Sequence, residues 1–387
     1  MRYVSFAINP RYQLVKAIHI HYSIDKEGKV RSVTTTTTPS TNFKAPLTQR
    51  EGFANRVKAF FKEASPTIAQ QRMVALLLLI CQGGITVTGS IVRVTGSGLG
   101  CVTWPNCHPG SLVPVAGAEP VLHQAIEFGN RLLTFVVTAA AVAAVVAVYQ
   151  AKRRKELKVY AWLSVAGIVV QAVIGGISVH MELVWWMVAA HFLPSMVLVW
   201  IAGMLYTRIL QHDDGTLTAM YPSVVRSLAI VAAVALSVVL ITGTMVTGSG
   251  PHAGDAEASL QGRLDVDTEM MAIIHAICMY VYLAFTAITV FLLHRYNAVK
   301  TAKKIGWILI VVILVQWAIG VTQFHLGVPR WTIPAHIAMS SVVTAMTSIL
   351  WANGIHRKDG TSPTTGSPQG DLKYEARQAA LALRKGR

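Results

Sequence analysis

The chain has 387 residues, of which 53% are hydrophobic and only 13% are charged. Its mean hydropathy of +0.49 excludes an ordinary soluble domain and predicts an all-α polytopic membrane protein. The net charge of +16 is attributed to membrane topology and to attraction toward anionic lipid, so nucleic-acid binding is not expected.

Two basic segments flank the apolar region. Residues 1–68 contain no apolar run long enough to span a bilayer, and the threonine tract from Thr34 to Thr38 is of low complexity. We therefore expect a disordered cytoplasmic arm here, without a cleavable signal peptide. The tail at 357–387 is also expected to be cytoplasmic, with a short helix from Tyr374 to Arg387.

Eight apolar segments are expected to cross the membrane, because one helical crossing needs about 20 apolar residues. They are residues 72–92, 124–149, 159–179, 185–207, 224–247, 270–293, 304–325 and 332–352. Lys and Arg concentrate before the first span, between the second and third, between the sixth and seventh, and after the last. Because basic loops stay in the cytoplasm, we expect a multi-pass plasma-membrane protein with both termini cytoplasmic.

The connection between the first two spans carries the most specific local motif, RVTGSGLGCVTWPNCH, from Arg93 to His108. Cys101 and Cys107 lie on the predicted oxidising face and are close enough in sequence to close a small ring. A disulfide is therefore favoured over free thiols. A metal site made of both cysteines and His108 is an alternative, although it lacks a fourth ligand at a usual spacing.

A repeat organises the membrane region, since residues 170–191 match residues 315–336 without a gap. The recurring pairs are Gln171 with Gln316, Gly175 with Gly320, His180 with His325, Trp186 with Trp331 and His191 with His336. We predict a tandem duplication that forms two four-helix bundles, at residues 69–210 and 211–356. An even number of spans in each copy places their pseudo-twofold axis along the membrane normal.

Four polar positions lie at matching depths in the spans that begin at the outer face: Asn130, His191, His275 and His336. Each is about four to six residues inside its span, roughly 8 Å below the outer boundary. A buried imidazole needs a partner, and two imidazoles on facing helices make a natural pair of axial ligands for haem iron. We assign that role to His275 and His336. Zinc is disfavoured because nothing supplies its remaining ligands.

The first half departs from this symmetry, because Asn130 stands where the second half has His275. An amide oxygen is a poor haem ligand, so the first site could be five-coordinate through His191, with an open face toward a substrate. Glu127 lies on the same helical face as Asn130. It has two interpretations: an interfacial carboxylate paired with Arg131, or a catalytic or substrate-positioning group.

Other polar residues near the outer boundary keep several interpretations. Arg93 and Arg131 are candidates for pairing with haem propionates, or they reach the lipid headgroups. His180 and His325 could serve as axial ligands, contact propionates or lie solvated at the interface. His123 is a boundary residue or a replacement for the missing imidazole.

At these residues the sequence resembles haem A synthase, a family of membrane enzymes of cytochrome oxidase biogenesis. The resemblance rests on the first outside loop, on IEFGNR at residues 126–131, and on the repeated Gln/Gly/His pattern, and it covers about residues 70–355. It implies eight helices in two halves, with a haem B cofactor in the carboxy-terminal half and haem O as substrate in the amino-terminal half. It further implies oxidation of the C8 methyl of haem O to a formyl group by successive hydroxylations, the final aldehyde forming when a geminal diol loses water.

The resemblance also assigns roles by motif: His275 and His336 as cofactor ligands, His191 as a ligand in the substrate half, Glu127 as a functional carboxylate, and Cys101 with Cys107 as a redox-sensitive pair. Two features depart from the family. The E-x-x-H motif ends in Asn130 here, which puts bis-histidine ligation of the substrate haem in doubt. In addition, no cysteine pair occurs between the fifth and sixth spans.

Several partners follow from the resemblance, including haem O synthase, cytochrome oxidase assembly factors, a quinone or another redox partner, and a second copy of the chain. A bacterial member of the family is expected. Two other functions stay open from the residues alone. A b-type cytochrome that only passes electrons would share the pair of His275 and His336, and a transporter with a polar site between repeats would bind no haem.

Overall fold

The computed structural model describes residues 17–24, 30–38, 65–251 and 262–358. The chain divides into two compact units, Met1–Ala59 and Phe60–Arg387. In the first unit, β1 (Ala17–Ile24) pairs antiparallel with β2 (Val30–Thr38). The disorder that we predicted for the arm stays a prediction. The rest of the arm and the helix predicted from Tyr374 to Arg387 lie outside the described residues.

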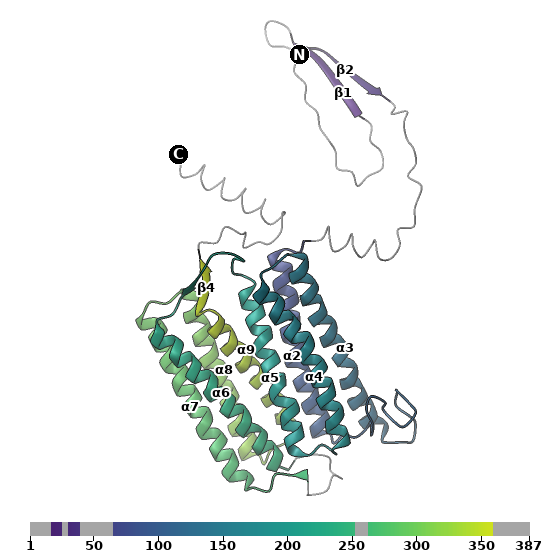
Figure 1. Cartoon of the computed structure of the whole chain (residues 1–387), viewed down its shortest axis with the longest axis vertical. Coiled ribbons are helices and arrows are strands. Elements are labelled where there is room, and N and C mark those ends of the chain that lie inside the picture. Colours follow the sequence, from purple (N-terminus) through teal and green to yellow (C-terminus); the bar gives the residue numbers. More distant parts are fainter. Residues whose placement is uncertain (1–16, 25–29, 39–64, 252–261, 359–387) are drawn as a thin grey trace. The chain divides into compact units, whose positions relative to one another are not determined.

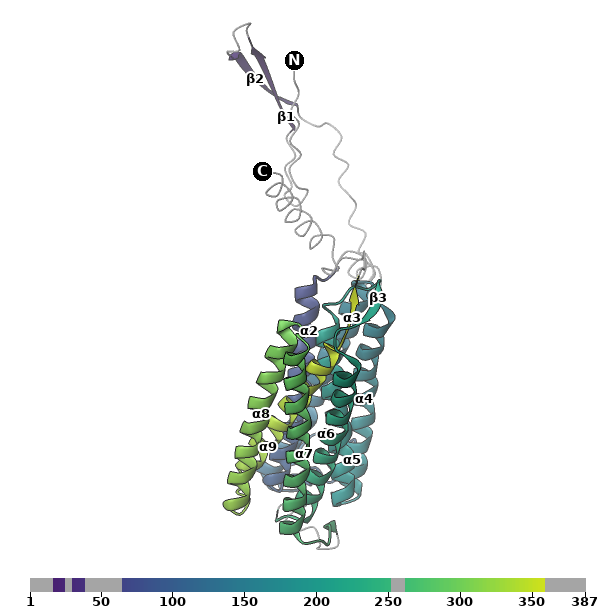
Figure 2. The same ribbon diagram turned by 90° about the vertical axis from the view of Figure 1, so that its left-hand side faces the viewer.

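The second unit is helical (Figures 1 and 2). Its helices are α2 (Ile68–Val94), α3 (Val121–Gln150), α4 (Lys155–His180), α5 (Trp185–Arg208), α6 (Ser223–Ser249), α7 (Thr268–Arg295), α8 (Lys300–His325) and α9 (Thr332–Ala352). Within the described part of the chain, these eight helices are long and apolar enough to cross a membrane. The all-helical fold class and all eight predicted spans are therefore confirmed.

The helices run slightly beyond the apolar segments that predicted them. Helix α4 begins at Lys155 and α8 at Lys300, although their apolar runs start later, because a helix continues into the interface where charged side chains reach water. Helix α2 starts with a capping box, in which Thr67 and Gln70 each bond the other's backbone N–H. Such a cap satisfies amide groups that the first helical turn leaves unpaired.

Two separate apolar cores hold the helices together. The first joins buried residues of α2, α3, α4 and α5, including Leu78, Val148 and Leu205. The second joins residues of the later helices, including Tyr282 and Leu309. Figure 1 places α2 to α5 on one side and α6 to α8 on the other, with α9 between α8 and α5. This arrangement agrees with two bundles, while the tandem duplication and its boundaries stay predictions.

Small side chains bring the two sets of helices together at α9, which packs on α5 and α2 as well as on α8. The buried hydroxyls of Thr86 and Ser341 are 3.0 Å apart. A Cβ atom at Gly203 would collide with the hydroxyl of Ser348. Small residues permit such close helix approach in membranes, so the last helix is part of the packing of the first four.

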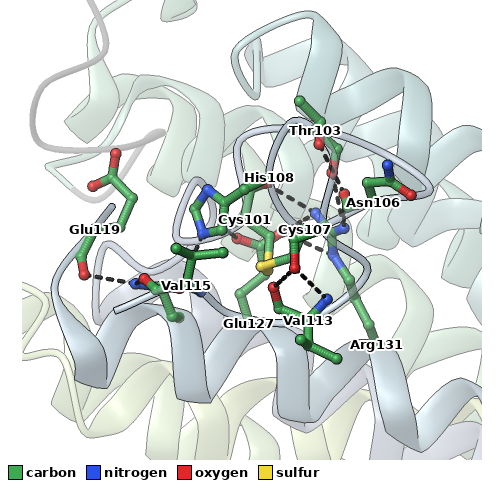
Figure 3. Close-up of a disulfide and its surroundings, with 12 residues drawn as sticks. Cys101, Thr103, Asn106, Cys107, His108, Val113, Val115, Glu119, Glu127 and Arg131 are labelled. Atoms are coloured by element: carbon green, nitrogen blue, oxygen red, sulfur yellow. Dashed lines mark hydrogen bonds and ion pairs between the residues drawn. A yellow bond between two sulfur atoms is a disulfide. The ribbon is translucent and has the colours of Figure 1, made fainter. Parts of the chain in front are cut away.

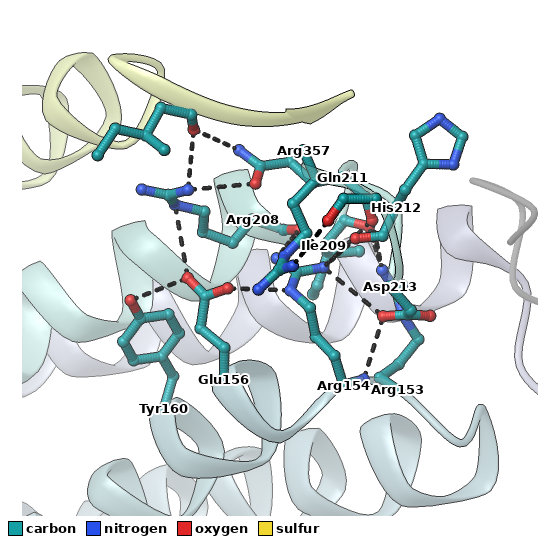
Figure 4. Close-up of polar contacts among 12 residues, drawn as sticks. Arg153, Arg154, Glu156, Tyr160, Arg208, Ile209, Gln211, His212, Asp213 and Arg357 are labelled. Atoms are coloured by element: carbon teal, nitrogen blue, oxygen red, sulfur yellow. Dashed lines mark hydrogen bonds and ion pairs between the residues drawn. The ribbon is translucent and has the colours of Figure 1, made fainter. Parts of the chain in front are cut away.

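A buried arginine organises the end of the bundle opposite the disulfide loop (Figure 4). The side chain of Arg153 is 0% exposed and donates to Asp213 Oδ1 (2.9 Å), to Gln71 Oε1 (2.7 Å) and to the carbonyl of Ile209 (2.9 Å). Burial lowers the pKa of the Arg153 guanidinium, and its hydrogen bond to Asp213 opposes that shift. The basic run between the second and third spans, from which we predicted topology, therefore contains a residue with a structural role.

A short antiparallel pair lies at the same end. It joins β3 (Thr216–Ala219), which follows α5, to β4 (Ile355–Lys358), which follows α9. Hydropathy did not predict these strands, because each has only four residues and they are distant in sequence.

Candidate functional site

Two histidines of the later helices face each other across the bundle. The ring centroids of His275, on α7, and His336, on α9, are 6.4 Å apart, and their planes are inclined by 60°. His275 Nδ1 lies 3.1 Å from the hydroxyl of Thr242 on α6. The buried Nδ1 of His336 has no hydrogen-bond partner among the described residues. The pair that the sequence singled out is thus brought together by three helices.

Each of the three intramembrane histidines lies against a glycine of a neighbouring helix. An added Cβ would lie close to the imidazole Cε1 at each glycine: 3.2 Å from His191 at Gly175, 3.1 Å from His275 at Gly243, and 3.1 Å from His336 at Gly320. These separations are shorter than ordinary van der Waals contact, so glycine provides the space that each ring occupies.

A glutamine contact recurs in both halves. Gln171 on α4 donates to the carbonyl of His191 at 2.9 Å, and Gln316 on α8 donates to the carbonyl of His336 at 3.1 Å. Both glutamine side chains therefore fix the backbone that carries a histidine. The repeat seen in the sequence thus corresponds to matching local contacts at two places in the fold.

The first half differs at the position that corresponds to His275 in the second half. Asn130 Oδ1 accepts a hydrogen bond of 2.7 Å from the hydroxyl of Thr88 on α2, so this amide oxygen is used in a contact between helices. His191 Nδ1 is buried and has no hydrogen-bond partner among the described residues. An unsatisfied buried imidazole nitrogen is unusual in a protein interior and is consistent with a ligand at His191.

The loop between α2 and α3 is closed by a disulfide between Cys101 and Cys107, as predicted (Figure 3). Both cysteines are fully buried. His108 is held by Gln124 instead of completing a metal site, with 2.9 Å between His108 Nε2 and Gln124 Oε1. Gln124 also bonds the loop backbone at Val115. Helix α3 is therefore the platform on which the loop folds.

Glu127 and Arg131 connect this loop to α3 (Figure 3). Glu127 Oε1 pairs with Arg131 Nη2 at 2.6 Å, and Glu127 Oε2 accepts from the backbone N–H of Cys101 at 2.6 Å. Arg131 also donates to the carbonyls of Cys101, Thr103 and Asn106 at 2.9 to 3.1 Å. The geometry therefore agrees with the first interpretation of Glu127, a carboxylate paired with Arg131. A propionate could reach Arg131 only if the loop released one of these bonds.

The remaining candidates near the outer boundary have diverse surroundings. Arg93 donates from Nη2 to the carbonyl of Thr247 at 2.7 Å and so connects α2 to α6. His180 is exposed, and its Nε2 lies 3.3 Å from the carbonyl of Trp104. His325 is also exposed and contacts the Phe324 ring at a centroid distance of 5.6 Å. His123 is half-buried at the start of α3. None of these contacts brings them to the pair of His275 and His336.

Sequence reasoning missed several residues that support the site. Thr242 and Gly243 contact His275 from α6, and Thr88 binds Asn130 from α2. Gly175 and Gly320 were visible as a repeated pair, and that recurrence at one offset was the available signal for a packing role. The partners on α2 and α6 gave no such signal, because only the fold shows which helices are neighbours.

Comparison with known families identifies the family to which the chain belongs. A family model described as cytochrome oxidase assembly protein, COX15-CtaA, matches residues 72–348, well over half of the chain. The chain belongs to the COX15-CtaA family. Three similar proteins carry the name Heme A synthase, which confirms the resemblance seen in the sequence.

These relatives of the COX15-CtaA chain are distant. The protein from Exiguobacterium sibiricum is 27% identical over 168 residues, which are 43% of this chain and 55% of the relative. That from Geobacillus thermodenitrificans is 29% identical over 34% of this chain and 41% of its own length. That from Lysinibacillus sphaericus is 34% identical over 29% and 36%. The matched region thus covers 55% of the length of the first relative and less than half of the length of the other two.

The histidine pair of this COX15-CtaA protein fits a haem iron. Imidazole nitrogen binds a transition metal at about 2 Å, so two rings on opposite sides of one iron would have centroids roughly 6 Å apart. The observed 6.4 Å agrees with that separation. Within the described residues, no three His, Cys, Asp or Glu side chains converge as a metal site. A haem iron needs only one or two protein ligands, because the porphyrin supplies four.

The glycine contact gives a first prediction for this COX15-CtaA protein. We expect Gly320→Ala to lower haem retention by the purified protein roughly tenfold, because overpacking beside His336 costs about 1–3 kcal/mol. The haem-to-protein ratio after size-exclusion chromatography measures the effect. Gly84→Ala is the matched control, since a Cβ there meets nothing within 4 Å. Equal haem content in both variants would show that the space beside His336 is not needed.

Proposed function

We propose that this protein is a haem A synthase that oxidises the C8 methyl of haem O to a formyl group through successive hydroxylations. Family membership and relatives named Heme A synthase support the proposal. The observation that carries it is the difference between the two halves. The later helices offer two facing imidazoles, His275 and His336, while Asn130 replaces the second imidazole in the earlier helices.

In this proposal the second half would hold the resident cofactor, haem B, with the imidazoles of His275 and His336 as its protein ligands. When bound, haem supplies one-electron redox chemistry that no side chain provides. The chain positions its ligands by packing: Gly243 and Gly320 leave room for the two rings, and the Thr242 hydroxyl contacts His275 Nδ1. Such support around a ligand sets its orientation.

The first half receives haem O through His191. The occupied Asn130 amide leaves the opposite face without an imidazole, which suits a substrate that must enter and leave. Many large apolar side chains on the outer helices are exposed, including Phe135 and Val169, so the isoprenoid tail of haem O would lie in an apolar environment. Arg93 is the remaining candidate for a propionate, because Arg131 is held by Glu127 and by the disulfide loop.

We further propose a plasma-membrane location with both termini cytoplasmic, which the distribution of Lys and Arg supports. The substrate must come from an enzyme that makes haem O, and haem A must pass to cytochrome oxidase assembly. The oxidation also requires an electron acceptor, for which a membrane quinone is a candidate.

Co-expression tests the proposed function. The chain would be produced with a haem O synthase in a host that lacks haem A, and extracted haems would be identified by mass. We expect haem A or its hydroxymethyl precursor, and we expect His191→Ala to abolish both while haem B remains bound. Haem B without any modified haem O, in the wild type, would favour the b-type cytochrome. Absence of all haem would favour the transporter.

A further inference from the structure

A cavity lined by polar and apolar groups lies at the end of the bundle opposite the disulfide loop, away from the histidine site. Its volume is about 230 Å³, several times the roughly 30 Å³ that one water molecule occupies in the liquid. The end of α5 and the turn after it form one wall, and the segment from α9 into β4 forms the other. The cavity therefore lies where the two halves of the chain meet.

Three of the seven residues that line the cavity are of basic types. His212 contributes from the turn after α5, and His356 and Arg357 contribute from β4. No carboxylate lines the cavity within the described part of the chain. Arg208 lies next to it and is close enough to Arg357 for the two charges to repel each other. Bringing like charges together is unfavourable unless an anion lies between or beside them.

The nearby carboxylates are already committed to other arginines (Figure 4). Asp213 pairs with Arg153 at 2.9 Å, and Glu156 pairs with Arg154 at 2.9 Å and with Arg208 at 3.7 Å. Among the described residues, no carboxylate forms an ion pair with Arg357. Its Nη1 makes one long contact, 3.4 Å to the carbonyl of Gly215, and its buried Nε has no hydrogen-bond partner among those residues.

The neutral walls of the cavity are held in place. Gln211 and Asn353 are buried, at 4% and 6% exposed. Gln211 Nε2 donates to the carbonyl of Ile355 at 3.0 Å, and Asn353 Nδ2 donates to the carbonyl of Ile349 at 2.7 Å. The basic groups therefore face a preformed polar space, and little reordering is needed when an anion enters.

We propose that this cavity binds a phosphate group, supplied by the headgroup of an anionic membrane lipid. Arginine binds phosphate strongly through charge-assisted hydrogen bonds, and Arg357 has donors that the protein does not use. Leu210, 46% exposed, adds an apolar edge to the polar lining, which suits a lipid better than free phosphate. The bound headgroup would join α5 to β4 and so stabilise the contact between the two halves.

Thermal unfolding of the full-length protein in detergent tests this site. The probes are phosphatidylglycerol, phosphatidylcholine and inorganic phosphate, each titrated separately. We expect phosphatidylglycerol to raise the unfolding midpoint, and we expect Arg357→Gln to weaken its apparent affinity roughly tenfold, the effect of losing one hydrogen bond to a charged group. Arg226→Gln is the matched control, because Arg226 is exposed near the start of α6 and does not line the cavity.

The arms of the titration separate the outcomes. Protection by inorganic phosphate with no added effect of phosphatidylglycerol would overturn the lipid source and retain the phosphate site. Equal protection by both lipids, or equal affinities in Arg357→Gln and the wild type, would overturn the site itself. If Arg357→Gln fails to fold, His356→Gln provides the same comparison. The measurement uses no haem chemistry, so its result is independent of the proposed enzymatic function.

Discussion

Replacing His336 with leucine is expected to lower the haem B content of the purified protein by at least roughly a hundredfold. Mutations that disturb only the support of a metal ligand already cost about 10–100-fold in affinity, and this one removes a ligand. Leucine places an apolar side chain in the same half-buried position against Gly320. The change should therefore affect the iron more than the fold.

The haem-to-protein ratio and the low-spin bis-histidine spectrum measure this result. His325→Leu is the matched control, because His325 is a histidine of α8 whose exposed ring lies against Phe324, and it should retain both signals. Thermal unfolding of both apoproteins checks folding. A wild-type spectrum and stoichiometry in His336→Leu would remove His336 from the proposed ligand pair.

Replacing Arg131 with methionine is expected to destabilise the protein by about 3–5 kcal/mol, the usual cost of leaving one member of a buried ion pair uncompensated. Glu127, with its side chain 6% exposed, would lose its partner at 2.6 Å. Three loop carbonyls would also lose their shared donor. We expect dithiothreitol to reduce the disulfide of Cys101 and Cys107 faster in this variant.

A double variant separates structure from catalysis. Glu127→Gln combined with Arg131→Met removes the unpaired charge, so part of the lost stability should return. If Glu127 also positions the substrate, haem A production will stay low in the recovered double variant. Recovery of both stability and haem A production would limit Glu127 to the loop. Thermal unfolding and haem analysis on the same preparations provide the two measurements.

The membrane spans could be predicted from sequence because hydropathy is a local property. The spans and the repeat together identified His191, His275 and His336, since the repeat places them at equivalent depths. It did not establish that His275 and His336 face each other at 6.4 Å, which depends on how α7 and α9 pack. Glu127 was left between two interpretations for the same reason, because its partner on the loop, the Cys101 amide, is 26 residues away.

The contacts of the charged side chains were the hardest feature to predict from the sequence. Arg153 belongs to a basic run from which we predicted topology, yet its side chain is fully buried and binds Gln71 on α2 and residues that follow α5. Arg93 was expected to contact propionates or headgroups, and it binds a carbonyl at the end of α6. A long side chain can reach several partners, and only the packed fold selects among them.

The packing of α9 against α2 has a consequence for biogenesis. The ribosome completes α2 long before α9, and membrane helices insert before they assemble. Until α9 arrives, Thr86 lacks the hydroxyl of Ser341, and Gly203 lacks the side chain that fills the space above it. A nascent chain that has inserted its first seven helices therefore still exposes the surfaces of α2 and α5 that α9 covers. A truncation before Thr332 would leave these surfaces exposed to membrane quality control.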